Sequence, residues 1–561
     1  MADQPSRGPA SLALVDEVRA WLRTQLHTRR SGVPVSMAVL WPIAVALGVA
    51  TGYAVIVFRW AIASLQTLFY GTDDVLLHSH AASLPWFVVL FLPVLGGLVV
   101  GVILSRFTPD AKARGVADVI QAAAIRGGKI ERGPGLASAS AALVTLSTGG
   151  STGREGPAIH LGAVLASWVS ERLNCSGVTA RDILGCAAAA AVSASFNAPL
   201  AGALFAMEVV LRHYALHAFG PITVAAVAGA VVSRIHLGDI TEFSVPTHGV
   251  EFYWEMPAFM ILGLICGLVA VAMMRSIFVA EAVGDRVQKA LSIPDWLRPA
   301  VAGLLLGLIA LEFPHVIGVG YETTSLALTV QYAFGTAVLF AAVKVVAVAI
   351  TLTGRMGGGV FSPALMLGAL TGCAFGELAV GLFPSISGAQ GLYALAGMGA
   401  VGGAVLGAPI SSTLIVFELT GDFQVAIAVM ISVSLASVVA DKMVARSFFL
   451  TQLERQGLTL SNGPQGYLAA TVPIIGLMRI NDARVTPERS AELYGQGLYL
   501  SASATLQTAL PMFEQTDRLF LPIIKPVEGE AGPEFLGALF RGDAFKAYSR
   551  ALEAEMREEH S

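Results

Sequence analysis

Hydrophobic positions follow one another over several long stretches of this chain, and polar positions gather between them. Four stretches that reach or nearly reach the roughly 20 residues needed by a bilayer-spanning helix are 37–63, 84–105, 255–280 and 335–353. None shows the period-two alternation of a barrel strand. Because lipid offers the backbone no hydrogen-bond partner, spanning segments of this kind must be helices. The pattern predicts an all-α protein that crosses the lipid bilayer several times.

Shorter apolar pieces, often about 12 to 18 residues long, occur at about 110–235 and again at about 355–445, where glycine or proline interrupts them. A helix broken at membrane depth persists only where other protein or a water-filled cavity satisfies the freed backbone groups. Broken helices are therefore expected around a transport site.

The sequence repeats itself twice at nearly the same spacing. PAIHLGA at 157–163 matches PALMLGA at 363–369, an offset of 206 residues (363 − 157). APLAGALFAME at 198–208 matches APISSTLIVFE at 408–418, an offset of 210 residues (408 − 198). These ordered matches predict two homologous halves, and in transporters built from repeats the substrate site lies where the halves meet.

Composition agrees with a membrane as the solvent, because 55% of the residues are hydrophobic, 13% are charged and the mean hydropathy is +0.70. A net charge of −4, with no basic block interleaved with aromatic residues, argues against nucleic acid as a partner. The first 36 residues hold five arginines and three acidic residues, which predicts a cytoplasmic N-terminus. The cysteines, which we expect to be reduced packing residues and not ligands of a metal, are Cys175, Cys186, Cys266 and Cys373.

The tail, from about residue 459, has the composition of a soluble domain. GLYLSASATL alternates apolar and polar residues and leads into a helix, two strands separated by GEAGPE, and a last helix near Asp543. This order predicts a small α/β module. The predicted organisation is a cytoplasmic N-terminal segment at 1–36, a membrane domain at 37–458 with halves at about 110–235 and 325–445, and a cytoplasmic domain at 459–561.

Two glycine-rich turns open helices at equivalent places in the two halves. STGGSTGREGP at 147–157 and GRMGGGVFSP at 354–363 each end in a proline that suits the first turn of a helix. A helix N-terminus offers free N–H groups and a partial positive charge of about half a unit. Two termini that converge form an anion site with no lysine or cofactor required, and glycine lets the backbone approach the ion closely.

Glu155 is the strongest candidate for a functional side chain. An ionisable group in a hydrophobic stretch costs about 2.5 to 3.5 kcal/mol on insertion scales and marks a functional site by default. The carboxylate can occupy the anion position when ionised and leave it when protonated, which makes one side chain both plug and proton carrier. The structural alternative is a carboxylate that caps its own helix or pairs with Arg154.

Three ordered motifs resemble the CLC family of chloride channels and chloride/proton exchangers. They are GREGP at 153–157, FNAPLAGALFAME at 196–208 and GGVFSP at 358–363. The resemblance covers about residues 37–458. It implies a fold of broken and tilted helices in two inverted repeats, and a homodimer with one pore in each subunit.

The resemblance also implies a set of site residues. Glu155 matches the gating glutamate, and backbone N–H groups near Val360 and Phe361 are expected to hold the anion. Arg154 is expected to anchor its loop electrostatically. The full anion-binding set that we infer is Gly153, Arg154, Gly156, Val360, Phe361, Phe449 and Arg114.

The chain departs from the family pattern in three places. The family's GSGIPE appears as ARGVAD, so Arg114, or Val116 in an alternative register, stands where a chloride-coordinating serine is usual. Phe449 takes the place of a coordinating tyrosine. Where exchangers often carry two successive glutamates, Glu208 is followed by Val209, which is common among channels. Glu208 and Val209 are therefore secondary site candidates.

Several hypotheses remain open at this stage. The protein is a chloride channel or a chloride/proton antiporter, and nitrate or fluoride are rival substrates. Glu208 and Glu418 either cap helices or take part in transport, and His160 either packs in the core or lines the pore. The segment GGSTG matches a nucleophile elbow around Ser151, the signature of a hydrolase, but that motif needs a preceding strand, so no enzyme is expected.

The tail resembles a CBS domain, and an adenosine nucleotide is a candidate ligand on that ground alone. No other cofactor is expected. The expected location is the cell membrane, as a multi-pass protein of a bacterial inner membrane with both termini in the cytoplasm.

Overall fold

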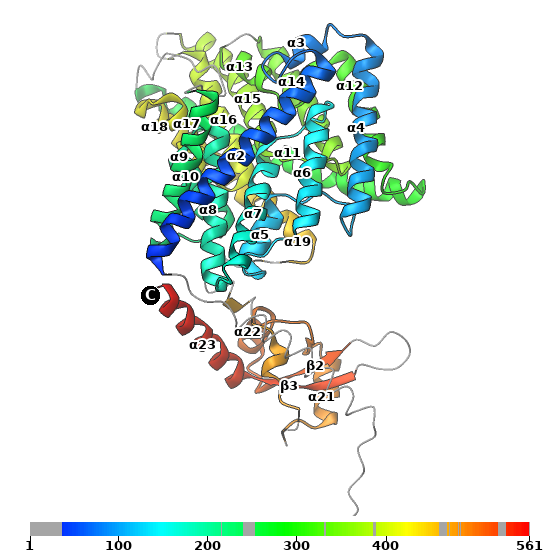
Figure 1. Cartoon of the computed structure of the whole chain (residues 1–561), viewed down its shortest axis with the longest axis vertical. Helices are drawn as coiled ribbons and strands as arrows, with labels where there is room; N and C mark the ends of the chain where they lie inside the picture. Colours follow the sequence, from blue (N-terminus) through cyan, green and yellow to red (C-terminus); the bar gives the residue numbers. More distant parts are fainter. Residues whose placement is uncertain are drawn as a thin grey trace, which may run out of the picture.

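A large helical part and a small tail make up the computed structural model of the chain (Figure 1). The structure describes residues 36–214, 216–238, 253–329, 332–384, 387, 389–458, 460, 468–469, 472–480, 482, 484–525 and 534–559. The segment predicted at 1–36 therefore lies outside the described residues, except for Ser36. The helical part extends from α2 to α19, and the tail lies beyond one end of it (Figure 1).

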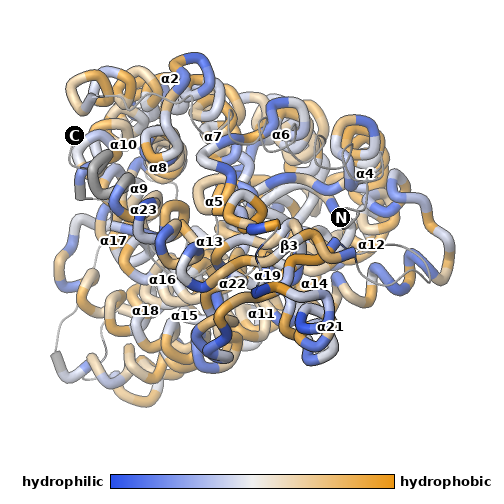
Figure 2. Tube along the Cα trace, turned by 90° about the horizontal axis from the view of Figure 1, so that it is seen from below, coloured by the Kyte–Doolittle hydropathy of each residue, from blue (hydrophilic) through white to orange (hydrophobic). Residues whose placement is uncertain are grey.

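Seven helical segments of the described chain are long and apolar enough to cross a membrane. They are α2 (Met37–Tyr70), α4 (Trp86–Phe107), α10 (Leu216–Leu237), α11 (Met256–Ala290), α14 (Phe334–Thr353), α15 (Phe361–Leu382) and α18 (Phe423–Val444), the last continued by α19 (Phe448–Arg455). The four predicted spanning stretches are confirmed by α2, α4, α11 and α14. Seen from the tail side, hydrophobic segments run along outer helices such as α11, α12 and α18 (Figure 2).

Shorter helices fill the two regions where broken helices were predicted. In the first half they are α5 (Val116–Ile125), α6 (Arg132–Ser147), α7 (Glu155–Arg172), α8 (Gly177–Phe196), α9 (Pro199–Phe205) and the π-helix η1 (Ala206–Leu211). In the second half they are α16 (Gln390–Leu406) and α17 (Pro409–Thr420). The remaining helices are α3 (Leu77–Ala81), η2 (Tyr253–Glu255), α12 (Arg298–Glu312), η3 (Pro314–Val316) and α13 (Tyr321–Leu328).

The breaks in the two halves have the same local cause. Helix α8 ends at Asn197 with φ 56°, and α16 ends at Gly407 with φ 68°, so both chains turn through the left-handed region. Pro199 and Pro409 follow two residues later and begin α9 and α17. A left-handed cap followed by proline stops one helix and starts the next.

The helices that follow these breaks cap each other. The Glu208 carboxylate, in the π-helix η1 that follows α9, accepts hydrogen bonds from the backbone N–H of Ile410 (3.0 Å) and of Ser411 (2.9 Å) at the start of α17. The Glu418 carboxylate, at the end of α17, accepts from Leu200 (2.9 Å) and Ala201 (2.8 Å) at the start of α9. Both glutamates are therefore helix caps, and each half caps a helix of the other.

Small residues let the helices of the second half pack closely. Helices α15 and α16 contact each other along their length, and a Cβ added to Gly397 of α16 would lie 2.9 Å from the Cα of Gly372 of α15. No side chain fits there without a backbone shift. Membrane helices commonly associate through small residues in this way, because lipid supplies no hydrophobic drive for larger ones.

The tail has a three-stranded sheet in the order β1-β2-β3. Its elements are η4 (Ile474–Leu477), α21 (Pro487–Gly495), β1 (Leu500–Ser501), α22 (Leu506–Thr516), β2 (Phe520–Lys525), β3 (Glu534–Phe540) and α23 (Arg541–Glu559). Strand β1 is parallel to β2 and β2 is antiparallel to β3, which confirms the predicted α/β module. Most of the predicted GEAGPE loop lies outside the described residues.

Strand β1 is shorter than the alternation of GLYLSASATL predicts. Thr505 forms an isolated bridge with Pro473, and the Ala504 carbonyl accepts a hydrogen bond from the N–H of Ile474 (3.1 Å). The end of the alternating segment therefore pairs with an earlier loop of the tail, and only two of its residues join the sheet.

Candidate anion-binding site

The N-termini of α7 and α15 meet at a short backbone bridge. The Gly153 N–H donates to the Gly359 carbonyl (2.7 Å), and the Gly359 N–H donates to the Gly153 carbonyl (2.8 Å). The two glycines are separated by 206 residues, the offset of the nearby repeat, so equivalent residues of the two halves pair with each other. This bridge brings the first turns of both helices, with their N–H groups and partial positive charges, to one place.

Glycines beside this bridge let the two turns approach closely. Gly358 has φ 151°, and a Cβ there would collide with the side chain of Thr152. A Cβ on Gly156 would lie 3.2 Å from the Cα of Gly359, so the two turns approach each other backbone to backbone. The glycine content noted in both sequence motifs is therefore used for a close approach of the halves.

The Glu155 side chain is 1% exposed and lies against the opposite half. Its Oε1 accepts hydrogen bonds from the phenol of Tyr321 (3.0 Å) and, at a short distance, from the hydroxyl of Ser362 in the first turn of α15. Its Oε2 has no hydrogen-bond partner among the described residues. A carboxylate of the first half thus occupies the helix N-terminus of the second.

The Arg154 side chain extends away from this point. One guanidinium nitrogen lies 3.4 Å from the Asp74 carboxylate, and the guanidinium sits over the Tyr321 ring, 4.6 Å from its centroid. Asp74 in turn accepts a hydrogen bond from Gln66 (2.7 Å). Arg154 therefore fixes its loop and the Tyr321 ring, which holds the Glu155 carboxylate.

A cavity of about 120 Å³ opens beside the bridge. The predicted site residues that line it are Arg114, Glu155, Gly156, Val360, Phe361 and Phe449. Gly153 and Arg154 lie behind it, in the backbone bridge and in the Asp74 pair. Glu208 caps α17, and Val209 lines a separate cavity together with Arg212 and Arg446.

Aromatic rings form much of the cavity wall. The Phe361 ring packs on Phe196 and Phe205, with centroids 4.8 and 6.1 Å away. Phe449 meets Phe448 edge to face at 5.8 Å. Ring edges carry partial positive charge and tolerate an anion, whereas ring faces repel it.

The Arg114 side chain does not reach into the cavity as a free cation. Its guanidinium pairs with Asp110 (3.0 Å) and Asp118 (3.6 Å), while its backbone N–H donates to Ser138 (2.8 Å). Phe449 has no polar group. The two side chains therefore offer an anion neither of the hydroxyl groups that the family resemblance leads one to expect.

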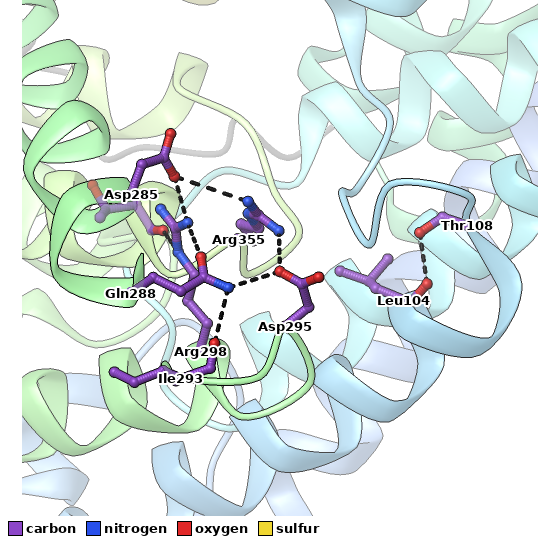
Figure 3. Close-up of polar contacts among 9 residues, drawn as sticks. Leu104, Thr108, Asp285, Gln288, Ile293, Asp295, Arg298 and Arg355 are labelled. Atoms are coloured by element: carbon purple, nitrogen blue, oxygen red, sulfur yellow. Dashed lines mark hydrogen bonds and ion pairs between the residues drawn. The ribbon is translucent and has the colours of Figure 1, made fainter. Parts of the chain in front are cut away.

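Basic residues outnumber acidic ones where the cavity opens toward the tail. Lys112, Arg114 and Arg355 line this part, against the single carboxylate of Glu281. Figure 3 shows how Arg355 is held, with guanidinium nitrogens 2.8 Å from Asp295 and 3.9 Å from Asp285. Because Arg114 and Arg355 are both paired with carboxylates, much of the positive charge of this lining is neutralised.

Arg298 fixes the loop that leads to the second glycine-rich turn. It lies between α11 and the end of α14, where it binds Asp285 (2.5 Å), Gln288 (2.6 Å) and the Thr353 carbonyl (2.7 Å) (Figure 3). Because Arg355 follows Thr353 by two residues, this network holds the entry to the GRMGGGVFSP segment.

Tyr321 and Ser362 are the functional candidates that the motifs did not single out. Ser362 lies inside GGVFSP, so a hydroxyl in the first turn of α15 was visible in the sequence. Tyr321 stands 166 residues from Glu155, and its only local signal is the preceding Gly320 with φ 92°, which opens α13. The contact between Tyr321 and Glu155 depends on tertiary structure. No group of His, Cys, Asp or Glu suited to a metal ion occurs among the described residues.

Comparisons with known proteins agree with this geometry. The family model described as "Voltage gated chloride channel" matches residues 96–441, more than half of the chain. The voltage-gated ClC-type chloride channel ClcB of Escherichia coli is 31% identical over 408 residues, which cover 71% of this chain and 94% of that protein.

Solved structures share the fold. A slow cyanobacterial Cl−/H+ antiporter matches with a TM-score of 0.66 and 22% identity over 74% of this chain and 97% of that one. A eukaryotic CLC transporter matches with a TM-score of 0.62 and 20% identity over 92% of this chain and 89% of that one. The second match extends beyond the membrane part into the tail.

Proposed function

The chain belongs to the CLC family of anion channels and transporters, and from this premise we propose that it moves chloride through the cavity beside α7 and α15. Members of this family are not enzymes, so the hydrolase hypothesis for Ser151 is excluded. The observation that carries the proposal is the buried Glu155 carboxylate at the meeting point of the two helix N-termini.

Glu155 acts as the gate in this proposal. The ionised carboxylate occupies the place that suits an anion, because two hydroxyl donors and the N-terminus of α15 stabilise its negative charge. Protonation removes that charge and turns one oxygen into a donor, so the side chain is held less strongly and swings away. Chloride then takes its place, bound by N–H groups near Val360 and Phe361, with Gly156 keeping the approach open.

Two modes of transport follow from the same first step. In an antiporter the protonated Glu155 carries its proton across as the anion passes, and in a channel the same motion only opens the path. The side chain of Val209 cannot relay protons, which favours a channel unless another group replaces the second glutamate. The missing hydroxyls at Arg114 and Phe449 keep nitrate and fluoride as alternatives to chloride.

We place this transporter in a bacterial inner membrane as a homodimer with both termini in the cytoplasm. An apolar groove on α17 and α18, lined by Ile410, Phe417, Phe423 and Met430, supports a subunit contact at that face. Pairing of Gly153 with its equivalent Gly359 supports halves related by a two-fold axis, as inverted repeats require. The order β1-α22-β2-β3-α23 supports a CBS-like tail, with an adenosine nucleotide as its candidate ligand.

The test is anion efflux from liposomes that contain the purified protein, with chloride and external pH recorded together. We expect Glu155→Gln to abolish the pH dependence of chloride efflux, because the amide cannot titrate. Glu171→Gln, at the other end of the same helix and partly exposed, serves as the matched control. Unchanged pH dependence in Glu155→Gln would refute the gating role, and repeating the assay with nitrate and fluoride gives the selectivity.

A further inference from the structure

His160 is a buried histidine whose ring lies beside the Gly115 backbone and the Asp118 carboxylate without a well-aligned hydrogen bond to either. It lies on α7, five residues after Glu155, and is 2% exposed. Neither of its ring nitrogens has a hydrogen-bond partner among the described residues. Buried polar groups are nearly always paired, so an unpaired imidazole in a well-packed helix needs an explanation such as water or an exchangeable proton.

A second cavity, of about 80 Å³, opens at this ring. The charged residues that share its lining with His160 are Arg114, Asp118, Arg126, Lys129 and Glu131. They come from α5 and the segments on either side of it, and the lining has no charged residue from α2, α8 or α15. Arg126, Lys129 and Glu131 are exposed, so the cavity leads from the surface to a buried ring. A polar cavity of this size holds water.

The two cavities are separate. Of the residues that line them, only Arg114 belongs to both. The start of α5 forms the wall between them, with Gly115 and Val116 on the side of the anion cavity and Asp118 on the side of His160. The Asp118 carboxylate holds this wall by accepting the Gly115 N–H (2.8 Å). An ion in the first cavity and a proton in the second would not share a path.

Helix α7 connects His160 to Glu155. Five residues of α-helix rise by about 7.5 Å along the axis and turn by about 140° around it, so the two side chains leave α7 on different faces and a proton passing between them needs water on the way. On α6, the residue opposite the ring is Gly135, where a Cβ would lie 3.2 Å from the Nε2 atom of His160. Glycine at that position lets α6 approach the Nε2 side of the ring closely.

We propose that His160 is a proton-binding station that passes protons between the tail-side solution and Glu155, in the role that Val209 cannot fill. The inference rests on the proposed gating role of Glu155. One ring nitrogen takes a proton from water in the second cavity, and the other gives a proton to water that leads to the Glu155 carboxylate. The imidazole returns to its neutral form, so one proton enters and one leaves in each step.

The experiment uses the full-length protein in liposomes, with a chloride gradient driving proton movement uphill. In wild type we expect protons to move in fixed ratio to chloride. In His160→Gln we expect chloride flux to persist and proton flux to fall by about tenfold or more, because glutamine keeps the polar side chain but cannot exchange a proton. Retained chloride flux also shows that the variant is folded. His160→Asn is measured in parallel, and the relay is scored on whichever variant retains chloride flux.

Matched variants separate the outcomes. His236→Gln, which changes a histidine on α10 that bonds the Val232 carbonyl, should leave the ratio unchanged. The relay would be overturned if His160→Gln left the ratio of protons to chloride unchanged, or if the wild-type protein moved no protons. Either result would leave the pH-dependent gating by Glu155 intact as a hypothesis, because Glu155→Gln tests it separately. If Arg126→Gln with Lys129→Gln lowered chloride affinity, the second cavity would be an anion site and the relay would also be overturned.

Discussion

Hydroxyl groups from distant parts of the chain hold the carboxylate of Glu155, the proposed gate. Its Oε1 is held by Tyr321 from α13 and by Ser362 from α15, and Arg154 fixes the Tyr321 ring from the other side. Hydrogen bonds to a charged group contribute about 1.5 to 3 kcal/mol each. In the proposed gate, the stability of the ionised Glu155 carboxylate therefore depends on two neutral side chains.

Tyr321→Phe removes one of these donors and should make the gate easier to protonate. Because the ionised carboxylate loses about 1.5 to 3 kcal/mol of stabilisation, the midpoint of pH-dependent chloride efflux should move to higher pH by about one to two units. Efflux from liposomes across pH 4 to 9 measures the midpoint. Tyr53→Phe, which changes an exposed tyrosine on α2, is the control, and a midpoint that stays in place would count against the clamp.

At the scale of elements, the sequence predicted which segments span the membrane and where helices begin better than it predicted which residues contact each other. The spans followed from long apolar stretches, and the starts of α7 and α15 followed from glycine and proline, because both signals are local. The unpaired state of His160 was not readable, because the same motif fits a packed ring equally well. The clamp by Tyr321 was not readable either, because it arises only when the two halves are assembled.

The caps on α9 and α17 give a prediction about these elements. Glu208→Gln should lower the stability of the protein by about 1 to 2 kcal/mol, because the amide offers the first turn of α17 a weaker acceptor and no charge. Glu418→Gln should have a comparable effect at α9. Thermal unfolding of the purified protein measures both, with the exposed Glu312→Gln as control. If Glu208→Gln kept full stability but lost proton movement, a transport role would replace the cap.

Over the whole molecule, the tail is tied to the membrane part by its last helix. Helix α23 contacts α8, the helix that precedes the break at Asn197 (Figure 1). The start of α23 is held by a two-point pair in which Asp543 accepts from two nitrogens of Arg479 (2.6 and 2.9 Å). The Arg479 guanidinium lowers the pKa of Asp543, as Arg484 lowers that of Asp482.

This pair predicts an acid-sensitive tail. A carboxyl group whose pKa is lower in the folded state stabilises the fold above its unfolded pKa of about 4, and that contribution is lost as the pH falls through the folded value. After correction for the intrinsic exchange rate, which itself falls with pH over this range, the protection of residues 500–525 in the full chain against hydrogen exchange should therefore decrease between pH 5 and pH 3. Asp543→Asn should already show the lower protection at pH 6. Asp517→Asn, which changes a carboxylate that is 86% exposed, should behave like wild type.

The reciprocal caps also bear on how such a chain arose. Glu208 caps a helix in the half that contains Glu418, and Glu418 caps a helix in the half that contains Glu208. Gly153 pairs with Gly359, the equivalent residue of the other half. A half-length ancestor with one such glutamate and one such glycine would have satisfied every one of these contacts by associating with a second copy of itself. Gene duplication and fusion then needed no new contacts, and the loss of either glutamate afterwards leaves an unmatched helix that its twin cannot rescue.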